Sequence, residues 1–475
     1  MTASLICGAV ACRTVSTESD AKARRSSIKP PIFPVLEWQS HRGGPLKEPF
    51  FLQTQPYTVE VALDAKPTSK EKIAATFTIN DGNGEVLTDR KISIKLRGFT
   101  SLDFPKKQYG INIVNDQGKD APISILGMAA ADEWVLSAPY NDKSLLRDIL
   151  TYNLSNLIGR RAPKTRIVNL ILNVTGQAPE NMGIYVITEK NTFGPGRIDV
   201  PKKNEKGTAF LATFDHQHEG DNVIWSGRET DVILEYPSLE KITPEQSKEF
   251  LTKFNDVEAL VSNPKGQGWD NIFEDHLDLS SAVDFFIIQE LARNIDGFRL
   301  SSSFYIPPKG KIFFGPLWDF NIAYGNASHE NGIQYEGWRS QEKGVWFGPL
   351  LAHPKFCKAM TARWTAARSE GSLSNDTIFN VIDQQAKIME PLVEQNFKRW
   401  PSLGKHLWPN PYWLASWQDE KDALKSWISL RTEWMDKTVA ALDCDAVVVS
   451  PPPVVTPNEP DSGEVDRWRD REPMR

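Results

Sequence analysis

Two aspartates stand in apolar surroundings a short distance apart in the sequence. The stretch "QELARNIDGFRLSSSFYI" (289–306) places Asp296 at the end of an apolar run and ahead of three serines. The stretch "FGPLWDFNIAYGN" (314–326) places Asp319 between a tryptophan and a phenylalanine. A buried carboxylate is costly unless it is paired or bound to a cation. The two acids are therefore either satisfied within the fold or take part in chemistry.

The order of these acids suggests phosphoryl transfer. Kinases place a helix, a polar loop with an aspartate that orients the substrate hydroxyl, a hairpin and then an aspartate that holds Mg²⁺. Magnesium takes hard oxygen ligands, and substrate phosphates complete its shell. A structural interpretation stays open, in which Asp296 caps a turn and Asp319 is a hydrogen-bonded carboxylate. The usual HRD, DFG and GxGxxG strings and a Walker loop are absent from the sequence.

Four further charged residues are candidates for contacting a nucleotide. Lys106 and Lys107 follow a glycine-containing loop between two expected strands, and lysines in a loop can bind phosphate oxygens. Glu189 and Lys190 end another expected strand, where neighbouring side chains point to opposite faces. One of these two would then face a given cleft. The alternative is a set of solvated lysines and local ion pairs, because lysine is mostly exposed in proteins.

A helix is expected over residues 142–159, where apolar residues recur at helical spacing. Asp142 is a candidate N-cap, and Gly159 is a stop signal. Arg147 lies near Asp142 on one helical face, which predicts an internal ion pair.

The remaining pattern divides the chain into two kinds of region. Alternating segments from residue 57 to about 115 predict strands, and "NDGNGE" between apolar runs indicates a hairpin. Further strands are expected at "IVNLILNV" (167–174), at "GIYVITEK" (183–190) and around residues 208–237. After residue 240 the pattern becomes helical, beginning with Thr243, Pro244 and Gln246, which match a capping box with proline at the first helical position. Later helices are expected over residues 354–369, 376–398 and 420–442.

We therefore predict an α+β protein in four parts. Residues 1–48 form a leader and linker, and residues 49–240 a β-rich N-terminal lobe. Residues 241–446 form a helical C-terminal lobe that contains both acids, and residues 447–475 a proline-rich tail expected to be disordered.

Composition limits the partners. The net charge is −6 at pH 7 over 475 residues, so no general basic surface is implied and nucleic acid is not expected as a partner. The four cysteines form no zinc pattern; Cys357 and Cys444 are either free thiols or one disulfide.

The run ending in "AVAC" near the N-terminus loosely resembles a lipoprotein cleavage box but lacks preceding basic residues. Envelope export and a cytoplasmic location both stay open.

Five strings together resemble the CotH kinase family, which comprises spore-coat and cell-surface proteins with a divergent protein-kinase fold. They are "RGFTSLDFPKKQYGINI", "LGMAAADEWVLSAPYNDKSLLRDIL", "GIYVITEK", "NIDGFRLSS" and "FGPLWDFNIAYGN", in the family's order over about residues 90–326. The resemblance implies transfer of the ATP γ-phosphate to Ser or Thr of a protein substrate, with Mg²⁺ or Mn²⁺. A β-rich lobe and a helical lobe would hold ATP between them.

The resemblance also implies roles for individual residues. Asp296 corresponds to the catalytic-loop aspartate and Asp319 to the metal-binding aspartate. Ser301 stands where well-studied members have an asparagine that holds a second metal, which puts two-metal catalysis in doubt. Lys106 or Lys107 would contact the nucleotide, with Glu189 or Lys190 near the phosphates. A non-catalytic surface or coat scaffold that retains the fold is the alternative function, and transfer of AMP also stays open.

Overall fold

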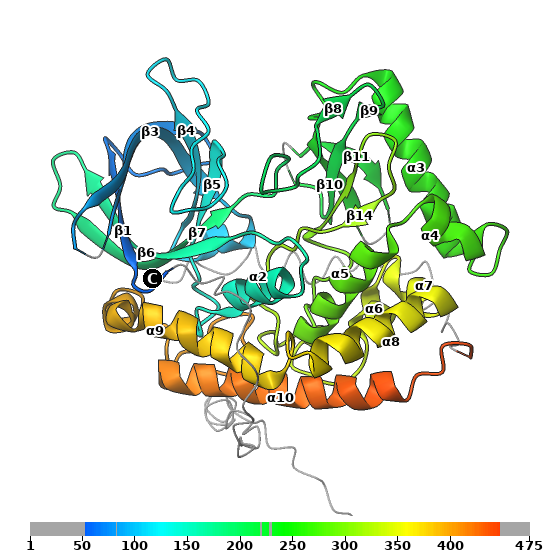
Figure 1. The fold of residues 1–475 in the computed structure, drawn as a ribbon. Helices are drawn as coiled ribbons and strands as arrows, with labels where there is room; N and C mark the ends of the chain where they lie inside the picture. Colours follow the sequence, from blue (N-terminus) through cyan, green and yellow to red (C-terminus); the bar gives the residue numbers. More distant parts are fainter. Residues whose placement is uncertain (1–52, 82, 219–220, 228–229, 447–475) are drawn as a thin grey trace, which may run out of the picture.

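The computed structural model describes residues 53–446, apart from residue 82, residues 219–220 and residues 228–229. The expected leader and tail lie outside the described residues. The described chain contains both helices and strands, as an α+β protein should. Figure 1 shows a barrel on one side, a second sheet with α3 and α4 on the other, and long helices running beneath both. Within the described residues, no helix has the length and apolar character needed to cross a membrane.

The N-terminal strands close into a barrel in the order β1-β2-β3-β4-β5-β7-β6, in which β1 runs parallel to β6. Its strands are β1 (Tyr57–Leu63), β2 (Ile73–Asn80), β3 (Val86–Arg97), β4 (Gln108–Val114), β5 (Glu133–Ser137), β6 (Thr165–Val174) and β7 (Glu180–Glu189). Alternating side chains such as Val59 and Val61 fill the interior, which is why period-2 patterning predicted these strands. Strand β7 is instead buried over most of its length, because α9 packs against it.

A second sheet has the order β11-β12-β10-β13-β14. Its strands are β10 (Phe210–Asp215), β11 (Val223–Ser226), β12 (Asp231–Tyr236), β13 (Ser302–Ile306) and β14 (Phe313–Phe314), and a separate two-stranded ribbon joins β8 (Lys203–Asn204) to β9 (Gly207–Thr208). Strand β10 pairs with β13 from beyond residue 300. Sheet pairing therefore groups residues 210–236 with the C-terminal half, although the sequence pattern placed them before a lobe boundary at residue 240.

The helices build most of the C-terminal half. They are α3 (Pro244–Ser262), α4 (Ile272–Asp275), α5 (Leu279–Ala292), α6 (Arg339–Lys343), α7 (Phe347–Leu351), α8 (Pro354–Ser369), α9 (Asn375–Arg399) and α10 (Trp417–Ala440), with short 3-10 turns at Thr100–Asp103 and Trp269–Asn271. The expected capping box at the start of α3 is present, with Thr243 and Gln246 bonded reciprocally. The short helices α6 and α7 were not predicted, because a five-residue helix is too short to show a periodic pattern.

Helix α2 (Arg147–Leu157) begins five residues later than expected, so the prediction that Asp142 is its N-cap is wrong. Asp142 instead accepts hydrogen bonds from the backbone N–H of Ser144 (3.1 Å) and of Arg147 (2.8 Å), which holds the preceding segment in a turn. The expected ion pair between Asp142 and Arg147 is confirmed, and both side chains are buried. Gly159 follows the helix with φ of 84°, consistent with a stop signal.

Helix α5 lies at the centre of the C-terminal core. Twelve of its side chains are buried, and a cluster of aromatic rings including Phe285, Phe286 and Phe347 packs around it. The buried helix therefore holds the start of the loop that carries Asp296 in a fixed position.

Further along the chain, Cys357 of α8 and Cys444 form a disulfide with Cα atoms 5.5 Å apart. The sequence had left open whether these cysteines are free thiols or one disulfide.

Candidate active site

A cleft of about 680 Å³ lies between the barrel and the C-terminal half. The barrel contributes Arg97 from the end of β3 and Thr188 from β7 to its lining. The C-terminal half contributes Asp215, Asp296 and Asp319. The two acids singled out from the sequence thus share one cavity.

The loops that carry the two acids are tied to each other. Helix α5 ends at Arg293, whose backbone is left-handed with φ of 40°. Asn294 then donates from Nδ2 to the backbone oxygen of Asp319 (3.2 Å). Its Oδ1 accepts from the backbone N–H of Asp296 (3.3 Å). One buried amide side chain therefore sets the relative position of both acid-bearing segments.

Asp296 lies among cations but is not closely bound by them. Its Oδ1 is 3.8 Å from Nη2 of Arg299, and its side chain is 30 % exposed. Burial raises the pKa of Asp296 above its ordinary value, Arg299 opposes this, and Glu330 adds to it. A carboxylate with a raised pKa is a better proton acceptor, which suits a group that orients or deprotonates a hydroxyl.

Asp319 is held by α2. Its backbone N–H donates to the hydroxyl of Tyr152 (3.1 Å), and the next N–H, of Phe320, donates to Oδ1 of Asp148 (2.6 Å). Asp319 has φ of 60°, a left-handed conformation that Asp tolerates better than most residues. The helix thus fixes an otherwise unfavourable backbone, and with it the direction of the carboxylate.

The acids around Asp319 carry more negative charge than the nearby cations balance. Burial and then Asp319 raise the pKa of Asp148, while burial and then Asp296 raise that of Asp319. Burial raises the pKa of Asp215 to about 7, and Asp319 and Asp296 contribute. Arg97, which lies over the ring of Trp318 with Cζ 4.9 Å from its centroid, opposes the shifts at Asp148 and Asp319.

This donor set fits a hard cation. Carboxylate and hydroxyl oxygens are the ligands that Mg²⁺ and Mn²⁺ take, and both Asp319 and Ser301 line the cleft. Over the described residues, however, no group of three or more His, Cys, Asp or Glu side chains is close enough to hold a metal by itself. A cation here would therefore need ligands besides these side chains, such as hydroxyl, water or phosphate oxygens.

The structure places the predicted nucleotide-contacting residues differently. Lys190 lines the cleft, with Nζ 3.2 Å from Oε2 of Glu133. Lys106 does not line it and is 1 % exposed; its Nζ donates to the backbone oxygen of Ile184 (2.6 Å) and to Oδ1 of Asn396 (2.9 Å). This lysine therefore joins the barrel to α9.

Lys107 and Glu189 also lie away from the cleft lining. Lys107 donates from Nζ to the backbone oxygen of Leu102. Glu189 is paired with Arg161 and accepts from the backbone N–H of Lys164 (2.9 Å). Both side chains are engaged within the barrel region, which matches the alternative of local structural pairs.

Sequence reasoning passed over several charged residues of the cleft, among them Arg97, Asp148 and Asp215. Arg97 and Asp148 stand inside the strings that carried the resemblance, and Asp215 ends an expected strand. A charged residue at a strand end next to a glycine-containing loop was the available signal for Arg97. No pattern marked Asp148, because its role depends on α2 packing beneath Asp319.

Comparison with known proteins identifies the family of the chain. The sequence profile described as CotH kinase protein matches residues 94–435, and the chain belongs to this family. It is similar to Inner spore coat protein H of Bacillus subtilis (strain 168), with 24 % identity over 274 residues, 56 % of this chain and 68 % of the relative.

Two solved kinases give weak structural matches. A Golgi casein kinase matches with a TM-score of 0.22 and 12 % identity over 76 % of each chain. The Helicobacter pylori proinflammatory kinase CtkA matches with a TM-score of 0.19 and 9 % identity, over 74 % of this chain and all of the other. Scores this low do not establish a shared arrangement of the elements. Family membership rests on the sequence match.

Proposed function

We propose that this protein is an atypical protein kinase that transfers the γ-phosphate of ATP to Ser or Thr of a protein substrate, using Mg²⁺ or Mn²⁺. The observation that carries the proposal is the coupling of Asp296 and Asp319 through Asn294 at one wall of a cleft. A structural role for two lone acids gives no reason for both to face the same cavity. A divergent kinase-like lobe arrangement, with the barrel on the nucleotide side, is part of this proposal.

Asp296 would orient the hydroxyl of the substrate and accept its proton. Phosphoryl transfer depends mostly on positioning and charge neutralisation. The raised pKa of Asp296 and its partly exposed side chain support this role, since the group must both reach the substrate and hold a proton. The substrate oxygen would then attack the γ-phosphorus in line with its bond to the β–γ bridging oxygen, and that bond would break to release ADP.

Asp319, with Ser301, would hold the metal ion, and Arg97 would contact the phosphates. A divalent cation neutralises the charge that builds up on the transferring phosphoryl group. The acids beside Asp319 repel one another, which favours cation binding. Arg97 faces them from the barrel, and a guanidinium matches phosphate geometry well. Lys190 is a second candidate on the same wall.

We also propose that the protein works outside the reducing cytosol, as a coat or envelope protein. Its relative is a spore coat protein by name, and disulfides such as that between Cys357 and Cys444 persist in oxidising compartments. Partners would be ATP and a protein substrate. A lipid anchor at the N-terminus stays a hypothesis, because it concerns residues outside those described.

The test is label transfer from γ-labelled ATP by the purified full-length chain, with Mg²⁺ or Mn²⁺ and with casein or myelin basic protein as a general acceptor. Asp296→Asn and Asp319→Asn are compared with Asp383→Asn, an exposed acid on α9 paired with Lys425. Label should appear with wild type and with Asp383→Asn and be lost in the other two. Phosphoamino-acid analysis identifies the acceptor residue, and transfer of α-label instead would indicate AMP. No label and no binding of Mg²⁺-ATP would favour the non-catalytic scaffold.

A further inference from the structure

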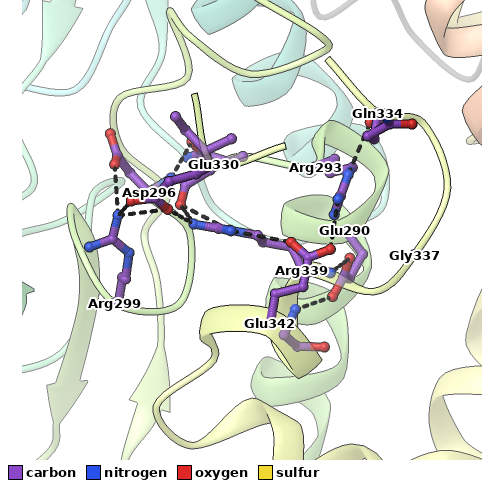
Figure 2. Close-up of polar contacts among 12 residues, drawn as sticks. Glu290, Arg293, Asp296, Arg299, Glu330, Gln334, Gly337, Arg339 and Glu342 are labelled. Carbon is purple, nitrogen blue, oxygen red and sulfur yellow. Dashed lines mark hydrogen bonds and ion pairs between the residues drawn. The ribbon is translucent and has the colours of Figure 1, made fainter. Parts of the chain in front are cut away.

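Beside Asp296 lies a network of acids and arginines that the proposed mechanism does not use (Figure 2). Arg299 donates from Nη2 to both carboxylate oxygens of Glu330, at 2.9 and 3.1 Å. The same nitrogen is 3.8 Å from Oδ1 of Asp296. One partly buried guanidinium thus contacts two carboxylates unequally, and it lies closer to Glu330 than to Asp296.

Glu330 is itself held in place. Arg339, which is 2 % exposed, donates to its Oε2. Arg339 also donates from Nε to the backbone oxygen of Ile295 (3.0 Å), the residue before Asp296. Arg299 and Arg339 keep the pKa of Glu330 below its ordinary value, although burial raises it, so Glu330 is ionised where Arg299 meets it.

Arg299 has few alternatives to Glu330. Its side chain is 12 % exposed, and its Nε–H has no partner among the described residues. Its backbone is fixed, since the backbone oxygen accepts from the hydroxyl of Thr230 (2.6 Å). A buried cation must be paired. If the charge of Glu330 is removed, the nearest remaining carboxylate among the described residues is that of Asp296.

We propose that Glu330 is a positioning residue that keeps Arg299 away from Asp296, so that the carboxylate of Asp296 stays free for the substrate hydroxyl. Both hydrogen bonds from Nη2 of Arg299 to the carboxylate of Glu330 are charge-assisted and therefore strong. They hold the cation near enough to orient Asp296 but too far to form a hydrogen-bonded ion pair with it. This inference rests on the proposed function, in which Asp296 receives the hydroxyl.

The test is Glu330→Gln, which keeps the shape of the side chain and removes its charge. Arg299 should then close on Asp296, and kcat for phosphate transfer should fall about tenfold, while the KM for ATP stays within about twofold, as for a group acting on the general base. Removing the arginine as well, in Glu330→Gln/Arg299→Gln, should restore at least half of the lost rate on a logarithmic scale. A loss of rate caused by a distorted loop would not be reversed by a second substitution.

Glu342 provides the matched control. It belongs to the same network, accepting from Arg339 Nη1 (3.3 Å) and Arg293 Nη2 (2.8 Å), and its exposure of 33 % is close to the 31 % of Glu330. It does not contact Arg299 in the ion pairs of the described chain. Glu342→Gln should leave kcat unchanged.

Glu330→Asp keeps the negative charge and should retain most of the rate. The backbone at residue 330 is left-handed, with φ of 47°, and Asp accepts this conformation.

Two results would overturn the inference: an unchanged kcat in Glu330→Gln, or a loss that the double variant does not relieve. A crystal structure of Glu330→Gln separates this inference from the proposed function, because it requires no activity. The distance between Arg299 Nη2 and Asp296 Oδ1 should shorten from 3.8 Å to hydrogen-bonding range. An unchanged distance contradicts the positioning role. A shortened distance in the variant, together with a wild-type protein that transfers no phosphate, contradicts only the proposed function.

Discussion

The two acids of the cleft are the same residue type in opposite surroundings. Asp319 lies among other carboxylates, and its shifted pKa reflects both burial and Asp296. Asp296 lies beside Arg299 and within the influence of Arg339. Surplus negative charge favours a cation at the first position. Nearby arginines at the second position orient a carboxylate that must stay available.

The hydrogen bonds that hold the two acid-bearing segments in place also differ. Asp319 is fixed through its backbone by Tyr152 and by the bond from Phe320 to Asp148, both from α2. The Asp296 loop is fixed from the other side, by Arg339 bonded to the backbone oxygen of Ile295. The two loops are also joined directly, because the side chain of Asn294 hydrogen-bonds to the backbone of Asp319 and of Asp296. Two aspartates of one cleft can therefore have different roles, because the charges and hydrogen bonds around them differ.

The largest expected effect separates the two acids directly. Asp296→Asn and Asp319→Asn should each lower phosphate transfer by about a thousandfold, within the range for loss of a general base or of metal-assisted charge neutralisation. Only Asp319→Asn should also abolish the increase in melting temperature on adding Mg²⁺-ATP. Differential scanning fluorimetry with and without the nucleotide checks this. If both variants lose binding equally, the two acids do not have distinct roles.

A second contrast concerns the cations that face the acids. Arg97→Ala should raise the KM for ATP about tenfold, which corresponds to ~1.4 kcal/mol of binding, because the guanidinium next to Asp319 and Trp318 is lost from the cleft. Lys107→Ala is the matched control, since its Nζ is bonded to the backbone of Leu102. Initial-rate kinetics at varied ATP concentration measure both. A larger effect in Lys107→Ala would support the lysines favoured by the sequence.

Both acids that the sequence singled out line the cleft, whereas only Lys190 of the three lysines does, and the reason is physical. Asp296 and Asp319 stand in apolar runs, where an unexplained charge is visible in one dimension. Arg97 and Lys106 occur in one charged loop region, and only the closing of the barrel decides which of them faces the cleft. Most strands and long helices followed from periodicity. The pairing of β10 with β13 did not, because the paired residues are 88 to 96 positions apart in the sequence.

Repulsion among the carboxylates should appear in the pH dependence of stability. Burial and neighbouring acids raise the folded-state pKa of Asp148 above its ordinary value, so its contribution to stability is present at pH below about 4 and is lost as the pH rises toward neutrality. Asp148→Asn should therefore melt at a higher temperature than wild type at pH 7.5, with a smaller difference at pH 4.5. Asp383→Asn, on the exposed face of α9, should show no such trend. Equal melting curves for Asp148→Asn and wild type at both pH values would contradict a surplus of charge at this side of the cleft.

Lys106 offers the most specific test, and the one with the smallest expected effect on catalysis, because it is a buried charge outside the cleft. Burial lowers its pKa to about 7, so the unfolded chain binds more protons than the folded one between pH 7 and the ordinary lysine value near 10.4. Stability should thus rise with pH across that window. Lys106→Met removes this dependence and leaves Asn396 and the backbone oxygen of Ile184 without their donor, which should cost about 1–3 kcal/mol at pH 9.

The KM for ATP in Lys106→Met should stay within about twofold, since the side chain does not contribute to ATP binding. Denaturant unfolding at pH 7 and pH 9 measures the first effect, and kinetics measure the second. A large increase in KM with unchanged stability would mean that Lys106 reaches the nucleotide after all, and that burial does not distinguish it from the charges of the cleft.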